Sequence, residues 1–335
     1  MKKVLKSNQM MLLILFAVLW LCFGLVNPTI LSMANVFALL RNSIVPAIFS
    51  LGLMLIMAQG GTDLSYNMIG AFASYVTIYL ITGKESGQMP LPVIFLIAMV
   101  IGALLQLINW FLIDRIHLES FISTLGMQLT LKGFLLAFVS TAYIYTLPDS
   151  LNAFSKQYLA TASFTEGTES VLHIGILFVI VLYVIVHMIL QHTNFGRQIY
   201  AIGGDIDSAR RAGIHVSAVR FATFAMAGAI CGIGGVMHDA LIRYSLPYPT
   251  DIVGQELLGI AAVTLGMGAV PKARGMVAGT LLGILLLKFV STNLIMLGIP
   301  SYWQDLISGI IILLGLLSQV KHRKRVRVTR KEAVG

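Results

Sequence analysis

An acidic residue lies among glycines between two long apolar runs. The segment from Gln59 to Ser65 contains Gly60, Gly61 and Asp63. Glycine weakens a helix and permits tight turns, and Asp63 or Ser65 can cap the helix that follows. Two interpretations stay open. The segment is either a helix interrupted beside a water-filled cavity, or a short loop before a capped helix.

Further polar side chains are scattered through apolar sequence. Buried ionisable and amide groups in such runs face the interior of a bundle, a partner or a water-filled path. The alternative for each is a hydrogen bond that holds two helices together. The candidates for lining a polar path are Gln59, Asp63, Asn67, Gln128 and Glu256. Among them, Asp63 and Glu256 are the strongest.

Patterns for covalent or metal chemistry are missing from the sequence. The seven histidines and two cysteines show no H-x-x-x-H or C-x-x-C spacing. Neither a G-x-S-x-G turn nor a G-x-x-x-x-G-K-[ST] phosphate loop occurs. We therefore expect no catalytic residue, no metal site and no cofactor in this chain. Any nucleotide must bind to another chain.

The composition indicates the elements that position these groups. Of 335 residues, 57% are hydrophobic and 11% charged, and the mean hydropathy is +0.88. A soluble domain carries about 25% charged residues. The sequence thus predicts one all-α domain, residues 1–335, built as a polytopic transmembrane bundle. Ten spans are expected at 10–26, 43–59, 64–81, 92–113, 121–147, 171–190, 214–237, 252–267, 276–290 and 302–318.

The basic residues set the orientation. With both termini in the cytoplasm, 17 Lys and Arg fall on the inner side and 4 on the outer side, as the positive-inside rule requires. The net charge of +9 lies in short loops and in the basic tail, residues 319–335. This pattern favours contact with membrane lipid over nucleic acid. The first apolar run is expected to be a retained span, and residues 148–170 a small outer cap or interfacial helix.

Glycines four residues apart predict close helix packing. Small residues at this spacing form a groove on one helix face. The contact is either within the chain or between subunits. The glycines concerned are Gly228, Gly232, Gly275, Gly279 and Gly283.

A polar loop, residues 191–213, separates two apolar runs on the predicted inner side. Asp205 and Asp207 precede Arg210 and Arg211, the order that suits a helix dipole. Gly203 and Gly204 are expected to turn the chain into this short helix, and Gly213 to end it. The loop is either a docking surface for a partner or a plain connector.

Several short motifs along the chain, including the polar loop, resemble those of a known protein family. The chain is similar to permease subunits of bacterial sugar ABC importers, which include ribose, xylose and autoinducer-2 permeases and are related to branched-chain amino-acid permeases. The resemblance covers nearly the whole chain. The matching pieces are Gly60–Ser65, Phe121–Met127, Phe195–Gly204, Ala209–Arg210, Ala212–Ile214, Gly275–Gly283 and Pro300–Gln304. The chain departs from the family at Tyr66–Asn67 and at Leu265–Lys272.

The resemblance implies a function and a set of partners. It implies a multi-pass inner-membrane subunit that translocates a monosaccharide or similar small polar solute within a homodimer or heterodimer. Cytoplasmic ATPase subunits would bind ATP and Mg, and a periplasmic or lipid-anchored binding protein would deliver the sugar. The implied docking residues are Phe195, Gly196, Arg197, Gly203, Gly204, Asp205, Ala209, Arg210, Arg211 and Gly213. The alternatives from the residues alone are a stand-alone ion-coupled transporter and an intramembrane enzyme.

Overall fold

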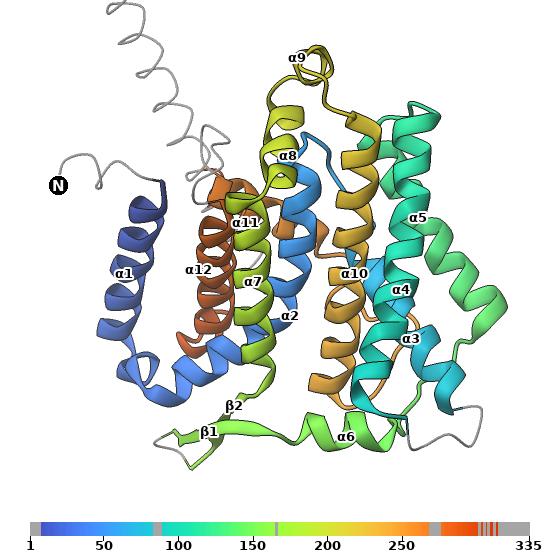
Figure 1. Cartoon of the computed structure of the whole chain (residues 1–335). Coiled ribbons are helices and arrows are strands. Elements are labelled where there is room, and N and C mark those ends of the chain that lie inside the picture. Colours follow the sequence, from blue (N-terminus) through green and yellow to red (C-terminus); the bar gives the residue numbers. More distant parts are fainter. Residues whose placement is uncertain are drawn as a thin grey trace, which may run out of the picture. The chain divides into compact units, whose positions relative to one another are not determined.

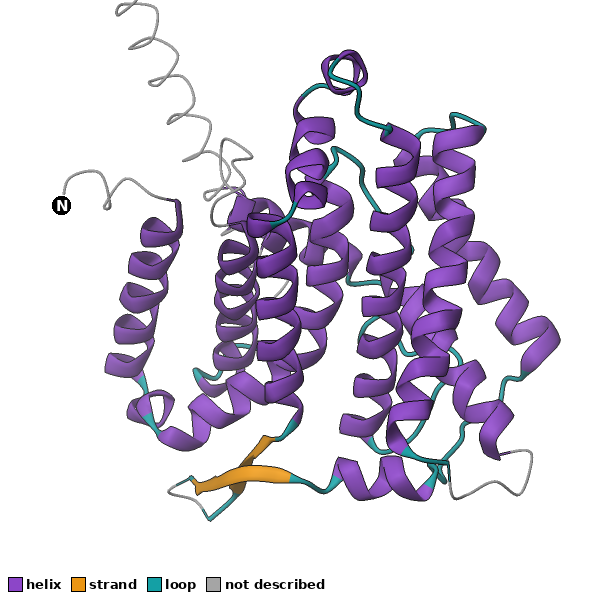
Figure 2. Ribbon diagram, viewed as in Figure 1, coloured by secondary structure: helices purple, strands orange, loops and turns teal. Residues whose placement is uncertain are grey.

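The computed structural model is mostly helical (Figures 1 and 2). It describes residues 8–82, 89–164, 167–267 and 276–300, together with Trp303, Leu306, Gly309, Ile310 and Leu313. The chain divides into two compact units. Unit 1 comprises residues 1–43, 161–172 and 260–335, and unit 2 comprises residues 44–160 and 173–259.

Most helices lie in unit 2. They are α3 (Tyr66–Thr82), α4 (Leu91–Trp110), α5 (Ser120–Phe134), α6 (Asp149–Ser155), α7 (Gly175–His192), α8 (Asn194–Gly204), α9 (Ile206–Arg211) and α10 (Val216–Ile242). Short π-helical stretches, η2 (Phe111–Arg115) and η3 (Leu135–Val139), extend α4 and α5. Unit 1 contains α1 (Asn8–Val26), η1 (Pro28–Leu31) and α12 (Met276–Met296). Helices α2 (Met33–Ala58) and α11 (Glu256–Met267) each contribute to both units.

Seven helices in the described part of the chain are long and apolar enough to cross a membrane. Nine of the ten predicted spans coincide with a described helix, and the tenth, 302–318, lies mostly outside the described residues. Helix α3 has 17 residues and α11 has 12. Both follow an irregular polar segment, so they are shorter than a full span. The count of ten and the orientation of the termini stay predictions.

The prediction for residues 148–170 was only partly right. Helix α6 occupies its start, but a two-stranded sheet follows, formed by β1 (Tyr158–Ser163) and β2 (Glu169–His173) (Figure 2). Tyr158 and Thr161 in β1 are residue types that favour strands. Consequently α7 begins at Gly175 rather than at residue 171. The long run 121–147 ends its helical part at Val139.

Glycines bring α4, α3 and α10 into backbone contact in unit 2. A Cβ added to Gly228 would lie 2.2 Å from the carbonyl oxygen of Gly102 on α4. A Cβ added to Gly232 would lie 2.2 Å from the carbonyl oxygen of Ala98. A Cβ added to Gly235 would lie 2.0 Å from the carbonyl oxygen of Gly70 on α3. No side chain fits at these crossings, so the three helices pack as closely as helices can.

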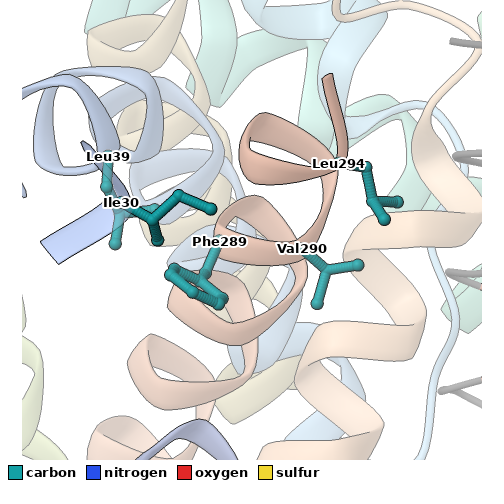
Figure 3. Close-up of a cluster of buried hydrophobic side chains, with 5 residues drawn as sticks. All are labelled: Ile30, Leu39, Phe289, Val290 and Leu294. Atoms are coloured by element: carbon teal, nitrogen blue, oxygen red, sulfur yellow. The ribbon is translucent and has the colours of Figure 1, made fainter. Parts of the chain in front are cut away.

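Aromatic packing builds the core of unit 1. Phe289 of α12 is fully buried and stacks on Trp20 of α1, with ring centroids 5.0 Å apart. Ile30, Leu39, Val290 and Leu294 complete the buried cluster (Figure 3). In the same unit the α11–α12 crossing is glycine-lined, because Gly266 faces Gly279 and Ala262 faces Gly283. Gly275 and the tail 319–335 lie outside the described residues.

The glycine crossings predict a sharp difference between two alanine substitutions. In Gly228→Ala the new methyl group meets the Gly102 carbonyl, and overpacking of this kind costs about 1–3 kcal/mol of unfolding free energy. In Gly126→Ala nothing lies within 4 Å of the added carbon. The higher helix propensity of alanine should raise the free energy of unfolding by at most about 1 kcal/mol. Thermal unfolding of the purified chain in detergent measures both. Equal stability of the two variants would contradict the packing described here.

Candidate functional site

The chain between α2 and α3 is an irregular segment, Gly60–Ser65, held inside unit 2. Gly60 has φ +85°, a conformation that glycine adopts without strain. Ser120 of α5 accepts a hydrogen bond from the Thr62 N–H at 3.2 Å and donates to the Thr62 carbonyl at 2.6 Å. The Leu64 N–H donates to the Thr124 hydroxyl at 3.0 Å. Side chains of α5 thus replace the backbone hydrogen bonds that the interrupted helix lacks.

Asp63 lies at the centre of this segment and is fully buried. Its Oδ1 accepts from the N–H and the hydroxyl of Ser65, both at 2.7 Å. Its Oδ2 accepts from the Gln106 amide of α4. Asn109, one turn further along α4, donates to Ser65 at 2.8 Å and to Gln106 Oε1 at 2.6 Å. Both carboxylate oxygens are engaged, so in this conformation Asp63 holds the break in place.

The break lies well inside the helix bundle. Gln106 precedes the end of η2, at Arg115, by nine residues, which is roughly 13 Å along a helix. At its other side, α3 packs against the middle of α10, where Gly70 contacts the Cys231 carbonyl. Gly60–Ser65 therefore interrupts the chain between α2 and α3 within unit 2, and Asp63 also accepts from the Ser65 N–H ahead of α3. That the break lies beside a water-filled cavity stays a prediction.

A second interruption meets the first. The chain from residue 243 to 255 is irregular, and α11 begins after it at Glu256. The Asn67 amide at the start of α3 donates to the Ile252 carbonyl at 2.6 Å. The Tyr66 hydroxyl donates to the Glu256 carbonyl at 3.3 Å. The N-terminal ends of two short helices therefore lie together, an arrangement that lines binding sites in membrane transport proteins.

Glu256 connects the N-terminal ends of α3 and α11 to α5. Its carboxylate accepts from the Gly254 N–H at 2.9 Å and from the Gln128 amide at 3.0 Å. One turn along α5, the Lys132 ammonium lies 3.8 Å from the centre of the Tyr248 ring. Gln128, Lys132 and Tyr248 are half-buried. These groups bond to one another here, and a carboxylate, an amide, an ammonium and an aromatic ring are the types of group that bind hydroxylated solutes.

A third polar cluster holds the second irregular segment, residues 243–255, at two points, Ser245 and Asp251. His238 of α10 is buried and lies between two carboxylates, with Nε2 2.7 Å from Asp251 and Nδ1 3.3 Å from Asp239. The hydroxyls of Ser74 and Ser245 donate to Asp239 at 2.5 and 2.7 Å. Sequence analysis gave none of these residues a role. The adjacent pair His238–Asp239 inside an apolar run was the available signal.

The polar loop forms two helices rather than one. Thr193 caps α8, which continues through Gly203 and Gly204, so the expected turn at these glycines was wrong. The chain bends instead at Asp205, which caps α9, and Gly213 follows α9 with φ +81°. A Cβ on Gly203 would lie 2.0 Å from the Ala58 carbonyl, whereas one on Gly204 would meet nothing within 4 Å. Helix α8 therefore rests directly on the end of α2.

The cap of α9 is charged. Oδ2 of Asp205 accepts from the Ser208 hydroxyl at 2.7 Å and Oδ1 from the Asp207 N–H at 3.1 Å. These hydrogen bonds, chiefly that of Ser208, hold the pKa of Asp205 below its ordinary value. The cap is therefore ionised at neutral pH, and its contribution is lost only when the pH falls through the lowered pKa. Arg210 and Arg211 are exposed on the same helix, and Figure 1 shows α9 beyond the ends of α7 and α10.

The structure brings three of the five path candidates together: Asn67, Gln128 and Glu256. Asp63 belongs to the neighbouring network with Gln106. Gln59 is 4% exposed at the end of α2, next to the contact with α8, and among the described residues neither atom of its amide has a hydrogen-bond partner. That these residues line a path stays a prediction.

Comparisons with known proteins agree with this architecture. The family described as the permease component of branched-chain amino acid transport systems matches residues 35–316. The ribose import permease protein RbsC of Escherichia coli K12 is 28% identical over 313 residues, covering 93% of this chain and 92% of its own. The ribose import permease protein RbsC of Bacillus subtilis 168 is 30% identical, and the match covers 90% of this chain and 89% of the relative. The galactose/methyl galactoside import permease protein MglC of Haemophilus influenzae is 27% identical, covering 93% and 95%.

No solved structure matches the chain. The family match nevertheless covers most of its length, and the relatives align from end to end. With its apolar helices, the chain is a multi-pass protein of the inner membrane. It therefore belongs to this permease-component family and is a membrane-spanning transport subunit of the ABC import type.

Proposed function

We propose that the chain translocates a monosaccharide or a similar small polar solute. The observation that carries this proposal is the meeting of α3 and α11 beside the half-buried Gln128. Glu256 and Gln128 supply acceptors and donors for hydroxyl groups, and Tyr248 supplies an aromatic face. The names of the relatives, which are ribose and galactose permeases, support a sugar.

The energy would come from a separate chain. The sequence has no phosphate-binding loop, so ATP and Mg would bind to cytoplasmic ATPase subunits. These subunits would dock on α8 and α9, which present Arg210 and Arg211. A binding protein would deliver the solute at the opposite end of unit 2. A second permease subunit, identical or not, would complete the pathway, with each chain acting as one permease domain.

A backbone route connects the docking helices to the break. Gly203 of α8 lies against the Ala58 carbonyl, and Gly60, where the chain turns, is two residues further on. The segment then continues to Asp63 and to the start of α3. A shift of α8 on nucleotide binding would change the position of the break, and hence access to the solute site.

Glu256→Gln tests the solute site. The glutamine keeps an acceptor for Gly254 and Gln128 but loses the charge. A hydrogen bond to a charged group is worth about 1.5–3 kcal/mol, so we expect solute uptake to fall about ten- to a hundredfold. Glu119→Gln, on an exposed residue, should leave uptake unchanged. Uptake is measured in proteoliposomes containing the full transporter, with assembly checked by co-purification. Normal uptake by a fully assembled Glu256→Gln complex rules out this site.

Gly203→Ala tests the route from α8 to α2. The added methyl group would push α8 off Ala58, at a cost of about 1–3 kcal/mol, so we expect transport per ATP hydrolysed to fall about tenfold. Gly204→Ala is the matched control, because its neighbourhood is open. The ratio of uptake to ATP hydrolysis in proteoliposomes measures the effect. If ATP hydrolysis stays fully coupled to transport in both variants, the proposed route from α8 to α2 is wrong.

Charge reversal at Arg210 and Arg211 tests docking. We expect the double glutamate variant to lose co-purification with the ATPase subunit, because like charges repel at the contact. Arg243→Glu, an exposed residue at the other end of α10, is the control and should assemble normally. A double variant that assembles and still couples ATP hydrolysis to transport would exclude α9 as the docking helix.

A further inference from the structure

A cavity separate from the helix breaks lies at the end of α4 and the start of α10. Its volume is about 840 Å³, within the range of about 300–1,000 Å³ of small-molecule sites. The end of α4 with the turn after η2 forms one wall, and the residues at the start of α10 form another. Arg210 of α9 completes it. Neither Asp63 nor Glu256 belongs to its lining.

The cavity has an apolar wall built on an aromatic pair. Trp110 packs edge-on against Phe221, with ring centroids 5.0 Å apart. The indole N–H donates to the Ser217 carbonyl at 3.3 Å, which ties the end of α4 to the first turn of α10. Val216 and Ala218 extend the apolar lining. This wall can contact the glycerol and upper acyl region of a lipid.

The rim of the cavity is basic. The Arg115 guanidinium carbon lies 5.6 Å from the centre of the Trp110 ring, and Arg210, His117 and His215 also line the opening. Each of these four side chains is exposed and offers N–H donors.

The acidic groups nearby do not cancel this charge. Asp114 is the acidic residue of the lining, and both its oxygens are engaged, by the Ser217 hydroxyl at 2.5 Å and by Arg220 at 3.3 Å. Asp207 lies 3.5 Å from Arg210, but both side chains are more than half exposed, so this pair is weak. The opening therefore keeps a positive potential that suits an anion.

We propose that this cavity binds the phosphate-bearing headgroup of an anionic phospholipid. Four apolar side chains around the same helix ends are exposed, at 43–51%: Phe111, Ile116, Leu118 and Phe221. A free phosphate ion makes no contact with an apolar surface. A lipid, in contrast, places its acyl chains against these apolar side chains and its headgroup in the basic rim. The proposal requires that the chain lies in a membrane, and it is independent of the solute. Because Arg210 also lies on the helix proposed above to dock the ATPase, the test uses the chain without ATPase subunits.

The test measures lipid binding to the purified full chain in detergent by native mass spectrometry. The probes are phosphatidylglycerol, phosphatidylcholine of the same acyl chains, and inorganic phosphate. We expect phosphatidylglycerol to bind more tightly than phosphatidylcholine. Arg115→Gln and Arg210→Gln should each weaken that binding about fivefold, the effect of removing one basic residue near an anionic surface. Thermal unfolding checks that each variant is folded.

Arg243→Gln is the matched control. Arg243 is also exposed but lies at the other end of α10 and does not line the cavity, so its loss should leave phosphatidylglycerol binding unchanged. Equal weakening by all three variants would mean general attraction to a basic surface and would overturn the proposal. So would protection from unfolding by inorganic phosphate that equals protection by phosphatidylglycerol. If Arg115→Gln weakens ATPase assembly while lipid binding persists, the cavity belongs to a protein contact instead.

Discussion

The structure depends on one constraint: a backbone that leaves helical geometry inside a membrane must find its hydrogen bonds elsewhere. The segment Gly60–Ser65 meets this constraint with Ser120 and Thr124 of α5 and with the carboxylate of Asp63. The polar side chains of α4 and α5 are therefore part of the backbone architecture. They support Asp63, Leu64 and Ser65 in a buried position, where water does not compensate for a missing bond.

The same constraint explains why the second irregular segment is pinned at both ends. Asp239 holds its start at Ser245, and His238 and Asn67 hold the adjacent Asp251 and Ile252 near its end. Moving the whole segment would therefore break hydrogen bonds to both α3 and α10.

Much of the fold was predictable because hydrophobic runs and glycine spacing are local signals. Nine of the described helices fall in the expected apolar runs, and Gly228 and Gly232 lie at a close helix crossing. The β1–β2 hairpin and the helical conformation of Gly203 were not predictable, because tertiary contacts decide them. Gln106 and Asn109, three residues apart on α4, were visible as polar residues in an apolar run. Yet their acceptors, Asp63 for Gln106 and Ser65 for Asn109, are 43 and 44 residues away in sequence. Only the fold brings them together.

The contact between Gly203 and Ala58 has a mechanical consequence. Side chains usually separate two packed helices, and their rotamers absorb part of any displacement between them. At this contact there is no side chain on Gly203, and the neighbouring atom is a main-chain carbonyl oxygen. The junction is therefore stiff, so a displacement of α8 would pass to the end of α2 with little loss of amplitude.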